Sequence, residues 1–299
     1  MIATKNLSKS FGKIPVLHGV TAQIQEGSIF GLIGSNGAGK STFLRLVAGI
    51  YKADGGEILV DGAEVFENVE AKRDLFYISD DQFFFANASM NDLRAYYKKI
   101  YPRFYDERFN ELTTSFHLDP TRRLNTFSKG MQKQAFIILA LSCRPKYLLC
   151  DETFDGLDPV MRQAVKKIFA DEVVQHNMTP IVASHNLREL EDICDHVGLL
   201  HQGGIVFERA MDELVYNVHK IQCVFSEEMA REDIKNIDII TFEKRGSLCT
   251  FTARGERDGV LAALGGYQPI FSEVLALTLE EIFICEMEGL GYDIDKIIL

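Results

Sequence analysis

The sequence has no tryptophan, seven prolines and no hydrophobic run long enough to cross a membrane. The missing tryptophan carries no functional message, but the missing run does, because a membrane-spanning helix needs about 18 or more consecutive apolar residues. Residues 1–5 also lack the apolar stretch of a secretory signal. Since 46% of the residues are hydrophobic, a sizeable core is available. We therefore expect a soluble protein.

Basic charge is also scarce, with 32 lysines and arginines against 43 acidic residues and a net charge of −11. This balance argues against a broad nucleic-acid-binding face, and we expect no nucleic-acid partner. No C-x-x-C pair is present, so we expect the cysteines to be reduced core residues of a cytosolic protein rather than disulfides or a metal site. The six cysteines are Cys143, Cys150, Cys194, Cys223, Cys249 and Cys285.

The most informative segment that is present matches the phosphate-loop pattern G-x-x-x-x-G-K-[ST]. It runs Gly34, Ser35, Asn36, Gly37, Ala38, Gly39, Lys40, Ser41, Thr42. The apolar run 29–33 before it suits a buried strand, and apolar residues at helical spacing follow it. Such a unit aims backbone N–H groups at phosphates, and we expect Lys40 to reach the β- and γ-phosphates and Ser41 to bind Mg²⁺. A chance match on a surface turn is the alternative, and the two flanks argue against it.

Two further apolar runs, 147–150 and 180–183, end in polar residues. Asp151 and Glu152 follow the first run, and His185 lies just beyond the second. Open α/β sheets place their ligands at the carboxyl ends of such strands. Residues 88–145 show helical rather than strand patterns, which indicates a helical insert. After residue 215 the pattern changes. Alternation at 221–225 and the residues 248–253 predict strands, whereas 256–264 and 277–289 predict helices. We therefore expect an α+β accessory domain over 216–299.

The segment Phe127-Ser128-Lys129-Gly130-Met131-Gln132 resembles the signature loop L-S-G-G-Q of the ATP-binding cassette (ABC) family. Ser128 and Gly130 match that loop, whereas Phe127 and Lys129 depart from it. The resemblance implies that Ser128 and Gly130 bind the γ-phosphate of a nucleotide held by a second subunit, and therefore that the protein acts as a dimer. The alternative is that Ser128 is an ordinary helix N-cap.

Three more segments resemble motifs of the same family. The resemblance implies that Asp151 holds Mg²⁺ and that Glu152 accepts a proton from, or orients, the attacking water. His185 resembles the family's switch histidine, which contacts the γ-phosphate. Gly156-Leu157-Asp158-Pro159 resembles the D-loop of the dimer interface, and Asp158 and Pro159 also fit the start of a helix.

The Q-loop departs from the family pattern. Counting back from Ala88-Ser89 places Asp80, rather than Gln82, where the family has a glutamine that senses Mg²⁺. Asp80 is therefore the candidate metal-binding residue here, with Gln82 the weaker alternative. Phe11 resembles the aromatic residue that stacks on adenine, and its alternative is a place in the core. Residues 83–85 are all phenylalanine and predict either a docking face for a membrane subunit or the core of the insert.

The resemblance covers residues 1–215 and implies an α/β P-loop NTPase cassette. We expect a mainly parallel core sheet, an antiparallel β subdomain, a helical subdomain at about 88–145 and a small C-terminal α+β domain. The implied function is ATP hydrolysis on the inner face of the cell membrane, coupled to an integral membrane permease. Residues 277–283 resemble bacterial exporter cassettes of the bacitracin-resistance kind, which favours export. A non-transport ATPase, for example one in cluster assembly, is the alternative.

Overall fold

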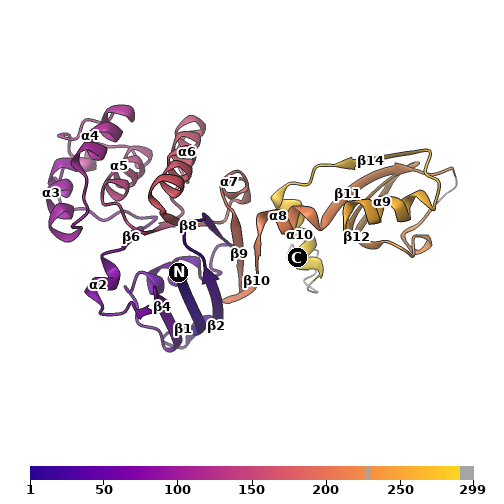
Figure 1. The fold of residues 1–299 in the computed structure, drawn as a ribbon, viewed down its shortest axis with the longest axis horizontal. Coiled ribbons are helices and arrows are strands. Elements are labelled where there is room, and N and C mark those ends of the chain that lie inside the picture. The colour runs from indigo at the N-terminus through magenta and orange to yellow at the C-terminus, as the bar shows by residue number, and fades with distance from the viewer. Residues whose placement is uncertain (227–228, 290–299) are drawn as a thin grey trace. The chain divides into compact units, whose positions relative to one another are not determined.

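The computed structural model describes residues 1–226 and 229–289, which form two compact units (Figure 1). The first unit is Met1–Glu208 and the second is Arg209–Leu299. The division falls within strand β10 (Gly204–Ala210), whereas the sequence places it after residue 215, within helix α8 (Met211–Tyr216). Each unit has its own hydrophobic core.

The first unit is built on a six-stranded sheet in the order β10-β9-β3-β8-β7-β6, and its five strands from β9 to β6 run parallel. Those five strands are β6 (Leu75–Ile78), β7 (Tyr147–Asp151), β8 (Thr179–Ser184), β3 (Phe30–Ile33) and β9 (His196–His201). Every residue of β3, β7 and β8 is buried, which explains why these strands are continuous apolar runs in the sequence. Their carboxyl ends carry the candidate site residues.

An antiparallel sheet in the order β2-β1-β4-β5 forms the second layer of this unit. Its strands are β1 (Ile2–Phe11), β2 (Ile14–Ile24), β4 (Gly55–Val60) and β5 (Ala63–Glu64). Alternate residues of β2 are buried, and Val20 and Ile24 among them belong to the core that this sheet shares with β3 and helix α1 (Lys40–Val47). The predicted β subdomain is therefore confirmed.

The helical insert consists of α3 (Met90–Ile100), α4 (Asp106–Ser115) and α5 (Lys129–Ser142), which Figure 1 shows grouped together. Helix α5 packs against α3, α4 and β6, and it is buried from Lys133 to Ser142. A helix that is buried on all sides needs apolar residues all round, as the run in α5 provides. The remaining helices of the unit are α2 (Val69–Lys72), η1 (Leu124–Thr126), α6 (Pro159–His176) and α7 (Leu187–Glu191).

The second unit contains a four-stranded antiparallel sheet in the order β12-β13-β11-β14. The strands are β11 (Val218–Val224), β12 (Asp238–Arg245), β13 (Leu248–Arg254) and β14 (Phe271–Leu275). The helices are α8, η2 (Arg231–Asp233), α9 (Arg257–Gly265) and α10 (Leu279–Gly289). One face packs apolar side chains against Val260 and Leu264 of α9. On β11, Lys220 forms an ion pair of 2.5 Å with Glu281 of α10.

All six cysteines are buried, as the sequence predicts. Within the described residues, no helix is both long enough and apolar enough to span a bilayer.

Candidate nucleotide-binding and hydrolysis site

The phosphate loop joins β3 to α1, and its backbone turns tightly before the start of the helix. Gly39 caps α1 with φ of 107°, a conformation that residues with a Cβ rarely adopt. A Cβ at Gly39 would also lie 2.7 Å from the Leu17 side chain, so the close packing of the loop requires glycine. Ser35, Asn36 and Gly37 are exposed at the open side of the loop. The loop therefore offers backbone N–H groups at the start of a helix, the geometry that binds phosphates.

Lys40 is folded back into the loop. Its ammonium group donates to the Gly34 carbonyl at 2.7 Å and to the Ser35 carbonyl at 3.3 Å. It also lies 3.3 Å from Glu152 Oε1, and its side chain is only 5% exposed. A buried ammonium group requires such partners. An entering phosphate would offer Lys40 a stronger anionic partner in the same place.

Ser41 and Asp151 meet at the carboxyl end of the sheet, although 110 residues separate them. The Ser41 hydroxyl donates to Asp151 Oδ1 at 2.9 Å, and the Tyr77 hydroxyl donates to Oδ2 at 2.8 Å. Arg45 Nε donates in turn to the Tyr77 oxygen at 3.2 Å. Burial raises the pKa of Asp151, and the bonds from Tyr77 and Ser41 oppose that rise. The network therefore helps to keep a buried carboxylate ionised.

This pair fits a magnesium ion. Mg²⁺ prefers oxygen ligands and commonly binds one or two carboxylates together with phosphates and water. The Ser41 hydroxyl and the Asp151 carboxylate supply oxygens that already lie within hydrogen-bonding distance of each other and next to the phosphate loop. The structure thus brings these two residues together, and their binding of Mg²⁺ remains a prediction.

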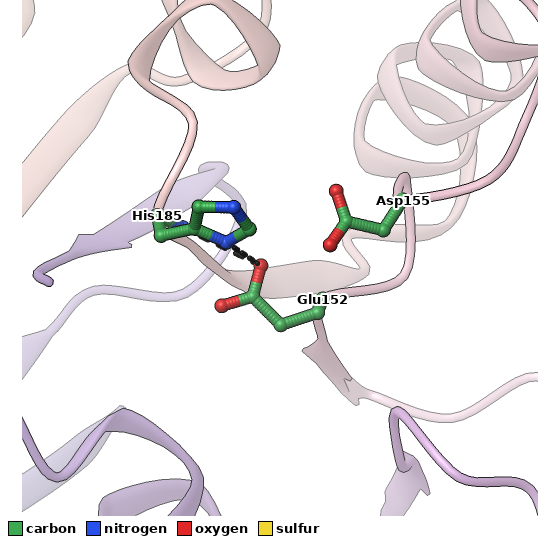
Figure 2. A group of neighbouring side chains, drawn as sticks. All are labelled: Glu152, Asp155 and His185. Carbon is green, nitrogen blue, oxygen red and sulfur yellow. Dashed lines mark hydrogen bonds and ion pairs between the residues drawn. The ribbon is translucent and has the colours of Figure 1, made fainter. Parts of the chain in front are cut away.

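Glu152 lies between Lys40 and His185 and is drawn with His185 and Asp155 in Figure 2. Its Oε2 is 3.0 Å from His185 Nδ1, and the backbone N–H of His185 donates to the same oxygen at 3.4 Å. Glu152 has φ of 48°, a left-handed conformation that is uncommon outside glycine. Such strained backbone is concentrated at functional sites, where the surrounding structure holds it in place.

The signature-like segment begins helix α5. Ser128 is the N-cap, and its exposed Oγ accepts from the Met131 N–H at 3.2 Å. Gly130 packs against the backbone of the D-loop segment, because a Cβ on it would lie 2.8 Å from the Gly156 carbonyl oxygen. Asp158 caps α6 by accepting from the Met161 N–H at 2.9 Å. The capping interpretations of Ser128 and Asp158 are therefore confirmed, and they leave the Ser128 hydroxyl at the surface.

Comparison with known proteins gives the family. The family model described as "ABC transporter" matches residues 17–155. The ABC transporter ATP-binding protein YtrB of Bacillus subtilis is 31% identical over 97% of this chain and 99% of its own length. The chain belongs to the ABC transporter ATP-binding family. It is an ATP-binding and ATP-hydrolysing cassette subunit, and the fold predicted from the sequence is confirmed.

Two further similarities involve the cassette. The bacitracin transport ATP-binding protein BcrA of Bacillus licheniformis is 30% identical over 72% of this chain and 71% of its own. A solved structure of an ATP-binding subunit of an ABC transporter superposes with a TM-score of 0.67 at 25% identity, over 72% of this chain and 91% of the other. The match to YtrB also extends through the C-terminal unit.

The Q-loop of the cassette places Asp80 and Gln82 in different surroundings. Asp80 Oδ1 lies 3.1 Å from the ammonium group of Lys133, and the Asp80 side chain is 57% exposed. Gln82 donates from Nε2 to the Ser79 carbonyl at 3.0 Å, so its amide is used within its own loop. Metal binding by either residue remains a prediction.

The aromatic candidates occupy three kinds of position. Phe11 is 43% exposed and meets Tyr51 edge to face, with ring centroids 5.3 Å apart, so it is not a core residue. Phe83 and Phe85 are 81% and 51% exposed. Phe84 instead packs toward Phe136 of the insert, with centroids 6.4 Å apart. Phe84 therefore fits the core interpretation, whereas the docking interpretation of Phe83 and Phe85 remains a prediction.

Tyr77 is a site residue that the sequence did not reveal, and its hydroxyl gives a first testable prediction. Hydrogen bonds to charged groups contribute about 1.5–3 kcal/mol, and about 1.4 kcal/mol is a tenfold change. Because Tyr77→Phe removes one donor from the buried Asp151 carboxylate, we expect the Mg²⁺ concentration for half-maximal ATP hydrolysis to rise about tenfold. The pKa of Asp151 should rise further, so the acid limb of the pH–rate profile should move to higher pH.

Tyr101→Phe is the matched control for this prediction. The Tyr101 hydroxyl is also partly buried but donates at 3.1 Å to the Leu75 carbonyl, away from Asp151. Titration of Mg²⁺ at saturating ATP compares the two variants. An unchanged Mg²⁺ requirement in Tyr77→Phe would show that the hydroxyl does not support the metal site.

Proposed function

We propose that two cassettes, identical or homologous, close around two Mg²⁺-bound ATP molecules. The observation that carries this proposal is the convergence of Lys40, Ser41, Asp151, Glu152 and His185 at one end of the sheet. Each copy would bind one ATP on its phosphate loop. The exposed Ser128 at the N-terminus of α5 supports contact with a nucleotide held by the other copy, since helix N-termini bind anions.

The five residues would divide the work as follows. Lys40 would leave Glu152 and bind the β- and γ-phosphates, and Ser41 and Asp151 would hold Mg²⁺. The bound ion would neutralise charge that develops on the phosphate oxygens. Glu152 would take a proton from the attacking water or orient it, and His185, in contact with Glu152, would reach the γ-phosphate. Phe11 would stack on adenine, while Asn36, Ala38 and the other loop amides would cradle the phosphates.

Hydrolysis would power a separate membrane permease, and we propose that the direction is export. The similarity to a bacitracin transport protein supports this direction, as does the exporter-like segment 277–283, which lies at the start of α10. The cassette would then act on the cytoplasmic side of the cell membrane. The exposed pair Phe83 and Phe85, with Tyr96 edge to face against Phe85, supplies an apolar surface for the permease.

The permease can be tested for by capture from native cells. Tagged Glu152→Gln would be expressed, supplied with ATP and Mg²⁺, and purified after gentle solubilisation. We expect a polytopic membrane protein to copurify, because a hydrolysis-deficient cassette would hold the closed, partner-bound state. Recovery of soluble partners alone would contradict the transport proposal and favour a non-transport ATPase, such as one in cluster assembly.

The apolar surface gives a second test. Phe83→Ser should reduce recovery of the membrane partner by about tenfold or more, since truncation of an aromatic hot spot at an interface costs about 2 kcal/mol or more. Val174→Ser is the matched control, because Val174 is 86% exposed on α6. Thermal unfolding midpoints of both variants should match the parent. Equal recovery with Phe83→Ser and the parent would exclude Phe83 from the docking surface.

A further inference from the structure

Lys133 joins three segments of the first unit and belongs to none of the motifs described above. It lies on α5, and its side chain is 8% exposed. The ammonium group lies 3.1 Å from Asp80 Oδ1 in the segment after β6. The same group donates to the backbone carbonyl of Glu152 at 2.7 Å. One buried cation thus contacts the Q-loop position and the backbone of the proposed catalytic residue.

We propose that Lys133 is a positioning residue for hydrolysis. Its hydrogen bond to the Glu152 carbonyl would hold the backbone of Glu152, and therefore its carboxylate, in place, while Asp80 would partly neutralise the Lys133 charge. This inference rests on the proposed role of Glu152 and extends it. Lys133 itself would touch neither ATP nor the attacking water.

The backbone of Glu152 shows why an anchor is needed. Its φ of 48° is a conformation that an isolated residue of this type leaves readily, at a cost of order 1–3 kcal/mol to hold. The Glu152 N–H donates to the Ala183 carbonyl at 3.0 Å, and the Glu152 carbonyl accepts from Lys133. These two bonds hold the residue on both sides. A displacement of about 1 Å at a reacting group can lower the rate about a hundredfold.

Charge explains the place of Asp80. A buried ammonium group needs an anionic partner, and Asp80 is the carboxylate that the structure pairs with Lys133. Without Lys133, Asp80 would lose this ion pair and leave an unpaired negative charge in the Q-loop. Without Asp80, Lys133 would keep the Glu152 carbonyl, and the more exposed aspartate position would fill with water. Loss of Lys133 should therefore cost more than loss of Asp80.

The experiment measures kcat and KM for ATP in the purified full chain carrying Lys133→Gln, Asp80→Gln or both. We expect Lys133→Gln to lower kcat about tenfold or more, with KM changed less than about threefold because the phosphate loop is untouched. Asp80→Gln should lower kcat by about threefold. The double variant should be faster than Lys133→Gln alone, since residues in contact give non-additive effects. Lys133→Arg, which keeps the charge, should retain more activity than Lys133→Gln.

Two reference variants separate the possible failures. Lys98→Gln removes a partner of Asp106 at 2.6 Å elsewhere in the insert and should leave kcat unchanged. Glu152→Gln, measured in parallel, tests the catalytic role by itself. If Glu152→Gln is inactive but Lys133→Gln keeps a kcat within twofold of the parent, only this inference is overturned. The same holds if the losses of kcat in Lys133→Gln and Asp80→Gln simply multiply in the double variant. Should Lys133→Gln not fold, Lys133→Met, which keeps the length of the side chain but has no donor, takes its place, and a kcat within twofold of the parent would overturn the inference.

Discussion

Replacement of Glu152 by glutamine should lower steady-state ATP hydrolysis about a thousandfold and leave ATP binding intact. A general base commonly contributes about 10²–10⁴-fold to the rate, and an amide cannot accept the proton of the attacking water. Glutamine matches the size of glutamate, so the fold should be unaffected. ATP affinity should stay equal or increase, because Lys40 loses the Glu152 carboxylate 3.3 Å away that competes with phosphate.

Single-turnover and steady-state assays, with ATP binding measured by calorimetry, would test this result. Glu57→Gln is the matched control, since it makes the same chemical change on the exposed Glu57 of β4. That variant should hydrolyse ATP at the parent rate. Normal turnover by Glu152→Gln would contradict the assignment of the catalytic role.

Replacement of Lys40 by alanine should weaken ATP binding by about a hundredfold or more. Charge-assisted hydrogen bonds to phosphate are among the strongest that side chains form, and Lys40 is the cation buried inside the loop. The variant should also lose most of the rise in thermal unfolding midpoint that ATP gives the parent, because a ligand stabilises the folded state only as far as it binds.

Lys5→Ala provides the control, because Lys5 is exposed on β1. Its midpoint should respond to ATP as the parent does. A purely structural role of Lys40 predicts a different pattern, in which the midpoint without ATP falls while the increase caused by ATP persists. Calorimetric titration at constant Mg²⁺ decides between the two.

Sequence patterns were sufficient where function depends on local geometry. The loop from Gly34 to Thr42 and the strand ends at Asp151 and His185 are each defined by a few consecutive residues, and the structure brings them together as expected. The family and the fold that these motifs predict are confirmed by the similarity to known cassettes. The individual roles of these residues stay predictions until the variants are measured.

The supporting residues could not be predicted in this way. Tyr77 occupies an apolar strand, where its ring has the character of a core side chain and nothing local marks its bond to Asp151, 74 residues away. Lys133 and Asp80 are 53 residues apart, and a lysine in a helical pattern suggests a solvated face. The first pair depends on how β6 lies beside β7 and the second on how α5 packs against β6, and both are properties of the tertiary structure.

Strand β14 of the C-terminal unit could not be predicted, for a different reason. Strand β14 is an edge strand with its first three residues exposed, so it lacks the alternation of buried and exposed positions that identifies a strand. Strand β13 has that alternation through Cys249 and Phe251, and the predicted strand at 248–253 is present. The predicted helix at 256–264 corresponds to α9.

The approach of Gly130 to the Gly156 carbonyl has a mechanical consequence. Because no side chain fits between them, helix α5 and the loop before α6 meet backbone to backbone and cannot slide past each other freely. A displacement of one of these segments must then displace the other, because no flexible side chain lies between them that could change its rotamer instead. A molecule that binds at Ser128 and displaces the start of α5 would therefore also displace the loop that follows Glu152, so that the two segments move together.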